Sequence, residues 1–153
     1  MVNQPFYSGG LGFSCTRCSA CCRYDSGYVF LSEKDVSALA GRLKIGYDEF
    51  ADRYCRWVGA GAEERLSLSE KSNYDCIFWE KQCLVYEHRP LQCRTFPFWQ
   101  SIVSSPEAWA FAAKSCPGIG KGCFHDREKI EDCLSRRAAE KIITRKISGG
   151  EVQ

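Results

Sequence analysis

Four cysteines near the N-terminus have the spacing that protein metal sites use. They form the CxxCxxCC run Cys15, Cys18, Cys21 and Cys22. A gap of two residues lets a tight turn aim two thiolates at one ion, so CxxC is the usual half-site for tetrahedral zinc and iron–sulfur clusters. The first three thiols could supply three corners of a [4Fe–4S] cluster. Neighbouring side chains diverge, so the adjacent Cys22 points to a second metal.

Four later cysteines bring the set to eight thiols, which is enough for two four-thiolate sites. One of them, Cys116, is followed by Pro117, as in the step that closes bacterial ferredoxin cluster motifs. Spacing does not reveal which thiols share a metal. The predicted ligands are Cys15, Cys18, Cys21, Cys22, Cys76, Cys83, Cys93 and Cys116.

The remaining residues of metal-binding type receive other predictions. We expect Cys55 and Cys133 to be packed in the interior as small apolar side chains, whereas Cys123 is a spare ligand. His88 and His125 lack a closely spaced histidine partner, so we do not assign them to a metal. The glycines between Cys116 and Cys123 are expected to form a flexible loop rather than a phosphate-binding nest.

Cysteine usage favours metal over disulfides. The chain has 11 cysteines in 153 residues, about 7%, which is below the roughly 8 to 10% of disulfide scaffolds. An odd number cannot pair completely within one chain. The N-terminal sequence MVNQPFYSGGLGFSC lacks the basic and apolar regions of a signal peptide. We therefore predict a cytoplasmic protein whose thiols stay reduced and bind metal.

Composition and charge narrow the function classes further. The 21 basic and 19 acidic residues nearly cancel and form no long basic block, so no nucleic-acid partner is expected. No apolar run approaches the roughly 18 residues of a membrane span, so no membrane partner is expected. A hydrophobic content of 44% suits a globular domain. Metal ions are the predicted partners, and a protein partner is left open.

Hydrophobic spacing indicates helices mixed with short strands. Ser32 followed by Asp35 predicts a helix start, with apolar residues recurring through Leu43. A second helix is expected from Asp48 to about Trp57. Strands are expected at 28–31, at 66–68 and in a hairpin over 76–86, with another hairpin over 102–111 turning at Pro106.

The predicted fold class is α+β, a small single domain of helices, short β-hairpins and irregular loops organised around a cysteine-ligated metal centre. We expect one metal-binding domain over 1–153, with the cysteine-cluster region at 13–120 and a C-terminal helix at 125–147. Ile130, Leu134, Ala138 and Ile142 form the narrow apolar stripe of that helix.

The cysteine pattern resembles the CxxCxxCC cysteine-cluster family, the YkgJ-type zinc- or iron-chelating domains. The likeness lies in the N-terminal run, in Cys76 to Tyr86, and in a segment similar to the family's RPxxCRxFP element. One departure is Asp75, where the family commonly has proline before the hairpin cysteine. The matching residues of that third segment are Arg89, Pro90, Cys93, Arg94, Phe96 and Pro97, followed by Cys116.

The resemblance implies a metal-binding protein with an iron–sulfur cluster or zinc, and with more than one metal if Cys22 serves a second ion. The resemblance is compatible with support of redox or methyl-transfer chemistry, and it does not establish that the chain is an enzyme. The alternatives are a structural zinc module that mediates protein interaction, and metal trafficking or storage. In the RPxxCR element, Pro90 would present Cys93 rigidly, because proline suits the start of a helical turn. Phe96, Phe98 and Trp99 would shield the metal from water. The arginines beside the predicted ligands in sequence would offset thiolate charge; they are Arg17, Arg23, Arg89 and Arg94.

Overall fold

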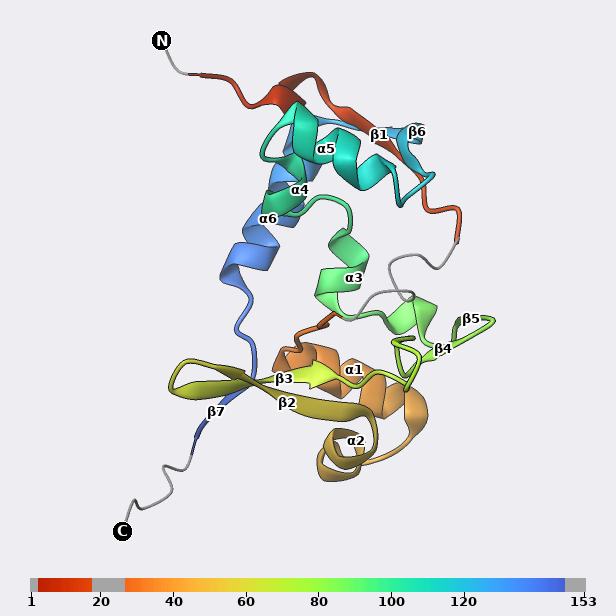
Figure 1. The fold of residues 1–153 in the computed structure, drawn as a ribbon, viewed down its shortest axis with the longest axis vertical. Coiled ribbons are helices and arrows are strands. Elements are labelled where there is room, and N and C mark those ends of the chain that lie inside the picture. The colour runs from red at the N-terminus through yellow and green to blue at the C-terminus, as the bar shows by residue number, and fades with distance from the viewer. Residues whose placement is uncertain (1–2, 18–26, 148–153) are drawn as a thin grey trace. The chain divides into compact units, whose positions relative to one another are not determined.

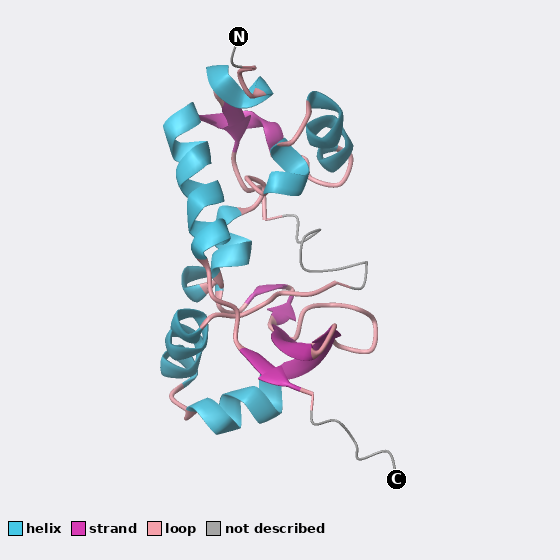
Figure 2. Cartoon of the chain, turned by 90° about the vertical axis from the view of Figure 1, so that its left-hand side faces the viewer, coloured by secondary structure: helices cyan, strands magenta, loops and turns pink. Residues whose placement is uncertain are grey.

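The computed structural model describes residues 3–17 and 27–147, which form two compact units. The first unit takes residues 3–17 and 93–140, and the second takes 27–92 and 141–147. Helices and antiparallel strands occur in both (Figures 1 and 2). The predicted α+β mixture is confirmed. The prediction of a single domain over 1–153 stays a prediction, because this division does not show whether either unit folds alone.

The second unit packs two helices against a three-stranded sheet. Strand β3 lies between β2 and β7, and β3 also pairs through Ser67 with Phe30 in the preceding extended segment. Its elements are α1 (Glu33–Leu43), α2 (Tyr47–Tyr54), β2 (Cys55–Ala60), β3 (Glu63–Leu68), β4 (Trp79–Glu80), β5 (Gln82–Cys83), the 3₁₀ helix Tyr86–His88 and β7 (Thr144–Lys146).

Local sequence signals set the boundaries of the first two helices. The Ser32 hydroxyl accepts a hydrogen bond from the Asp35 amide at 3.2 Å, and the Asp35 carboxylate accepts one from the Ser32 amide at 3.1 Å. This reciprocal capping box starts α1 as predicted. Helix α2 ends at Tyr54, earlier than predicted, because Cys55 already pairs with Leu68 of β3.

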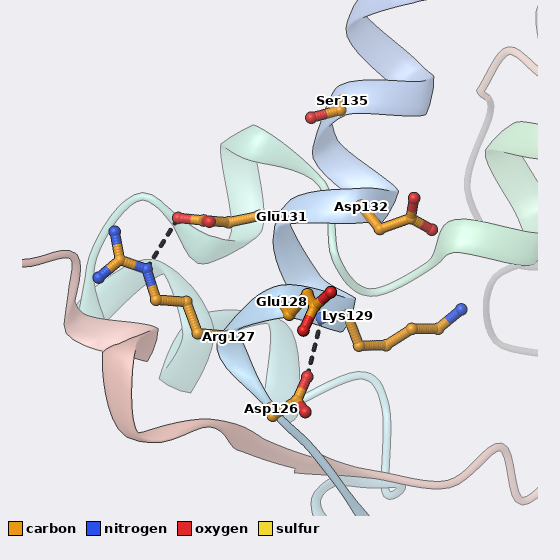
Figure 3. A pocket seen from close by; sticks show the side chains of 7 residues that line it. All are labelled: Asp126, Arg127, Glu128, Lys129, Glu131, Asp132 and Ser135. Atoms are coloured by element: carbon orange, nitrogen blue, oxygen red, sulfur yellow. Dashed lines mark hydrogen bonds and ion pairs between the residues drawn. The ribbon is translucent and has the colours of Figure 1, made fainter.

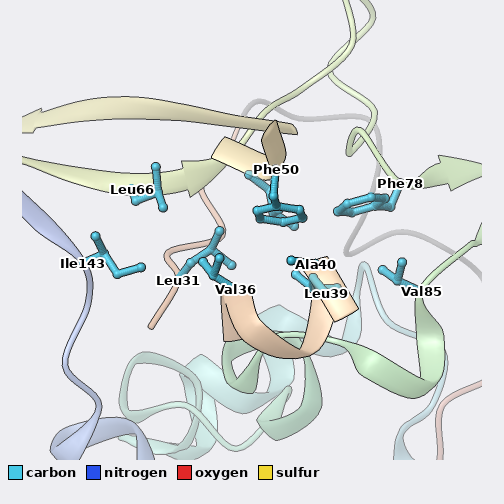
Figure 4. Close-up of a cluster of buried hydrophobic side chains, with 10 residues drawn as sticks. Leu31, Val36, Leu39, Ala40, Phe50, Leu66, Phe78, Val85 and Ile143 are labelled. Atoms are coloured by element: carbon cyan, nitrogen blue, oxygen red, sulfur yellow. The ribbon is translucent and has the colours of Figure 1, made fainter. Parts of the chain in front are cut away.

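The core of the second unit lies between the sheet and α1 (Figure 4). Leu31, Leu39, Phe50 and Leu66 are each 0% exposed. Phe50 and Phe78 stack with ring centroids 6.3 Å apart. Alternation along β3 directs Leu66 and Leu68 into this core, which confirms the predicted strand at 66–68.

The first unit combines a two-stranded ribbon with short helices and one longer helix. Its elements are the 3₁₀ helix Phe6–Gly9, β1 (Leu11–Phe13), α4 (Gln100–Val103), α5 (Pro106–Ala113), β6 (Ile119–His125) and α6 (Arg127–Ala139). Strands β1 and β6 are antiparallel, with Leu11 opposite His125. Helix α3 (Leu91–Thr95) begins in the second unit and ends in the first.

The predicted hairpin over 102–111 is wrong, since this stretch forms α4 and α5. The Ser105 hydroxyl accepts a hydrogen bond from the Ala108 amide at 3.0 Å and caps α5. Pro106 follows at the first helical position, where its missing N–H leaves no bond unmade. The predicted flexible glycine loop is also wrong, because Ile119–His125 forms β6.

The C-terminal helix is shorter than predicted. Helix α6 ends at Ala139, and the chain then extends so that the Ile143 amide donates to the Leu31 carbonyl at 2.9 Å. Burial of Ile143 in the second unit's core accounts for this end. Within residues 3–17 and 27–147, no helix is both long and apolar enough to cross a membrane.

Leu39→Ala is expected to lower the free energy of unfolding by about 2–5 kcal/mol, because it removes a fully buried side chain and leaves a cavity. Denaturant unfolding followed by circular dichroism measures the change. The control is Leu84→Ala, at a side chain 48% exposed, which should shift stability by about 0.5 kcal/mol or less. Equal effects of the two substitutions would contradict this description of the core.

Candidate metal centre

Cys15 lies in a turn that supplies its sulfur with a hydrogen-bond donor. The amide of Arg17 donates to Cys15 Sγ at 3.3 Å, and Arg17 has a positive φ of 56°. A backbone N–H directed at sulfur stabilises the negative charge of a thiolate, as hydrogen bonds do at metal–sulfur sites. The Cys15 side chain is exposed. This geometry fits a metal-binding thiolate.

The pairing of β1 with β6 brings the chain next to Cys15 close to the chain next to Cys116. The Ser14 amide donates to the Gly118 carbonyl at 3.3 Å, and the Cys123 amide donates to the Ser14 hydroxyl at 2.8 Å. Cys15 directly follows Ser14, and Cys116 lies two residues before Gly118. The backbone segments next to these two predicted ligands therefore meet at one end of the ribbon.

This close approach depends on glycine. A Cβ atom at Gly118 would lie 2.0 Å from the Ser14 carbonyl oxygen. A Cβ atom at Gly122 would lie 2.2 Å from the Ser14 hydroxyl, and Gly122 also has a φ of +76°. Sequence reasoning missed this role, although the alternating glycines before Cys123 are a signal of close backbone approach.

Cys93 lies in α3, three residues before a group of aromatic rings. The rings of Phe13 and Phe96 meet edge to face at 6.2 Å, and those of Phe96 and Trp99 at 5.1 Å. Phe13 precedes Cys15 by two residues. The segments that carry Cys15 and Cys93 thus share one aromatic cluster of Phe13, Phe96 and Trp99.

Cys76 and Cys83 belong to the second unit, on the predicted hairpin. Trp79 joins them, since its amide donates to the Cys76 carbonyl at 2.8 Å while it pairs with Cys83 across β4 and β5. Both cysteines are half-buried and pack against the second unit's core. Asp75 orders the preceding turn, where its carboxylate accepts a hydrogen bond from the Asn73 side chain at 3.1 Å.

The structure describes five of the eight predicted ligands. Cys18, Cys21 and Cys22 lie outside the described residues. Cys15, Cys93 and Cys116 belong to the first unit. Among residues 3–17 and 27–147, no group of three or more His, Cys, Asp or Glu side chains is arranged to hold one metal ion.

Cys55 and Cys133 are packed, as predicted. Burial raises the pKa of the Cys55 thiol to about 12, and burial also raises the pKa of Cys133. Cys133 is 6% exposed in the first unit's core, and Cys55 packs against the second unit's core from β2. Thiols that stay protonated are poor metal ligands. Cys123, the predicted spare ligand, is exposed on β6.

A histidine and an arginine considered in the sequence analysis contact other residues of the structure. A ring nitrogen of His125 lies 2.9 Å from the Phe13 carbonyl oxygen, and this ring meets Phe98 edge to face at 5.1 Å. Arg89, one of the arginines expected to offset thiolate charge, lies over the Tyr86 ring at 3.9 Å. Arg23 lies outside the described residues.

An open depression on α6 does not contribute thiols (Figure 3). Its charged side chains form ion pairs along the helix, and Arg127 Nε lies 2.9 Å from Glu131 Oε1. Asp132 likewise lies 3.1 Å from Arg136. The depression is lined by Asp126, Arg127, Glu128, Lys129, Glu131, Asp132 and Ser135.

Comparison with known proteins supports a metal site. The family model described as "CxxCxxCC: Putative zinc- or iron-chelating domain" matches residues 14–117. An uncharacterised protein of Methanocaldococcus jannaschii, MJ0661, is 34% identical over 100 residues, which is 63% of this chain. The match spans 50% of that protein, so the chain covers about half the length of this relative. No solved structure matches the chain.

Gly118→Ala is expected to destabilise the protein by about 1–3 kcal/mol, because the added methyl group collides with the Ser14 carbonyl. Denaturant unfolding measures the loss, and faster hydrogen exchange at the Ser14 amide locates it. Gly59→Ala on β2 is the matched control, since nothing lies within 4 Å of its Cβ position. Ser14 exchange that is as slow in Gly118→Ala as in the wild type would refute the contact.

Proposed function

We propose that this chain, which belongs to the CxxCxxCC family of zinc- or iron-chelating domains, binds a zinc or iron centre through cysteine thiolates. The observation that carries the proposal is the N–H···S hydrogen bond from Arg17 to Cys15 at 3.3 Å. Cys55 and Cys133, which pack against the two cores, are left out of the site. The proposed ligands are Cys15, Cys18, Cys21, Cys22, Cys76, Cys83, Cys93 and Cys116.

Charge explains why donors beside these sulfurs matter. Eight thiolates carry about eight negative charges, and two divalent ions offset only half of them. The Arg17 amide offsets part of the charge on Cys15. Thiolate ligands need a reducing compartment, so we place the protein in the cytoplasm as part of this proposal.

For the metal itself, we propose an iron–sulfur cluster of the [4Fe–4S] type. The supporting observation is the aromatic cluster of Phe13, Phe96 and Trp99. Phe13 lies two residues before Cys15, and Phe96 lies three residues after Cys93. Solvent exposure and hydrogen bonds to sulfur set the reduction potential of such clusters. A bound cluster would supply one-electron transfer, and redox or methyl-transfer support is the activity we propose for it.

Anaerobic purification followed by elemental analysis tests this proposal. Iron with acid-labile sulfide in the isolated or reconstituted protein is the expected result. Stoichiometric zinc without iron would overturn the iron–sulfur assignment and leave the zinc centre. A protein that retains neither metal would overturn the proposed function.

A structural zinc role is the second candidate, and the size of the first unit's core favours it. Among the described residues that core has four buried members, against ten in the second unit. Small cores often need a metal for stability, and metal binding then contributes folding free energy. Chelation would unfold the first unit if this role holds. A cooperative thermal transition that survives complete metal removal would exclude it.

Cys18→Ser and Cys93→Ser are each expected to lower the bound metal per chain, because a serine hydroxyl remains protonated where a thiolate is needed. Inductively coupled plasma mass spectrometry measures the metal content. Cys55→Ser is the matched control, because this thiol is protonated and packed. It should keep full metal content and lose only stability. Wild-type metal content in Cys93→Ser would remove Cys93 from the ligand set.

A further inference from the structure

The extended segment 27–31 is hydrogen-bonded along both of its edges. On one edge, Leu31 donates to the Leu66 carbonyl at 3.1 Å, and the Val29 amide donates to the Ser67 hydroxyl at 3.1 Å. At its start, the Gly27 amide donates to Glu70. The other edge has no neighbouring strand among the described elements, and a side chain takes that position.

That side chain is Gln92, which is 9% exposed. Its Nε2 donates to the Tyr28 carbonyl at 2.7 Å, and its Oε1 accepts from the Phe30 amide at 3.1 Å. One residue of a parallel strand bonds in the same way, because its N–H donates to the carbonyl before the facing residue and its C=O accepts from the amide after that residue. The Gln92 side-chain amide therefore takes the place of the backbone N–H and C=O of one residue in a neighbouring strand. A primary amide is suited to this role because it donates and accepts at once.

The residue before Gln92 is fixed as well. The Leu91 amide donates to Asp35 Oδ1 at 3.1 Å, while the other oxygen of this carboxylate takes part in the cap of α1. Asp35 is 4% exposed, so its position is set by packing and by these bonds. Pro90, just before, is fully buried. The first turn of α3 is thus held at three consecutive residues, and Cys93 is the next one.

We propose that Gln92 is a positioning residue for the metal centre, whose side-chain amide holds the first turn of α3 against segment 28–30 and so sets the direction of the Cys93 thiol. This inference rests on the proposed function, because it takes Cys93 as a ligand. Gln92 itself carries no metal-binding atom in this role. It acts by removing the rotational freedom of the turn that presents Cys93.

Gln92→Glu and Gln92→Met test the role with side chains of similar length. Glu keeps the acceptor for Phe30 but sets a carboxylate oxygen against the Tyr28 carbonyl, whereas Met removes both bonds. The probe is cobalt(II), whose thiolate charge-transfer absorption reports the number and geometry of cobalt–sulfur bonds. Both variants should bind cobalt on the order of 10- to 100-fold more weakly, with altered charge-transfer bands. The Phe30 amide should exchange faster in Gln92→Met than in Gln92→Glu.

Three further variants separate positioning from stability. Gln100→Glu, at an exposed residue of α4, should leave cobalt affinity and spectrum unchanged. Leu39→Ala should lower the unfolding temperature without altering the spectrum. Gln92→Asn keeps the amide on a shorter side chain, so it should show a partial loss and provides a milder change if the other Gln92 variants do not fold.

The outcomes distinguish this inference from the proposed function. A wild-type protein that binds no cobalt, zinc or iron would overturn the proposed function. A wild-type protein that binds cobalt, together with Gln92 variants of equal affinity and identical spectrum, would overturn the role of Gln92 alone. The same spectral change in Leu39→Ala as in Gln92→Glu would also overturn it, because stability would then explain both.

Discussion

The close approach of Ser14 to Gly118 is the contact that holds the segment leading into Cys15 beside the segment following Cys116. It joins the strand that leads into Cys15 to the strand that follows Cys116, and it leaves no room for a Cβ atom at Gly118. The two strands pair Leu11 with His125 and Gly12 with Phe124, and the register then shifts so that Phe13 pairs with Ile119. Segments far apart in the sequence, one leading to Cys15 and one following Cys116, are thereby held together by the fold.

Local signals in the sequence predicted the elements that depend on local contacts. Ser32 and Asp35 cap α1 from within four residues, so the start of this helix could be read directly. The stretch 102–111 was mistaken for a hairpin because a short apolar pattern fits either strand or helix. Ser105 and Pro106 carried the helix signal that should have decided it. The glycines of β6 form a strand only because of distant Ser14, which no local pattern reveals.

In the candidate site, too, local features could be predicted from the sequence and long-range contacts could not. Spacing predicts the ligands of the N-terminal cysteine run, because CxxC is a local geometric requirement. The residues that hold them could not be found from spacing, since the partners of Gln92 and Gly118 lie far away in the sequence. Cys55 and Cys133 were separated from the ligands by apolar surroundings, and their raised pKa values agree with that separation. Supporting residues therefore require the tertiary structure.

The contrast between these two kinds of cysteine has a consequence for oxidative stress. Oxidants attack thiolates, and they attack accessible ones first. Cys55 and Cys133 are shielded by protonation as well as by packing. Exposed Cys15 lacks that packing. Oxidation of the chain would therefore begin at exposed thiols such as the proposed ligand Cys15, while the two interiors stayed intact.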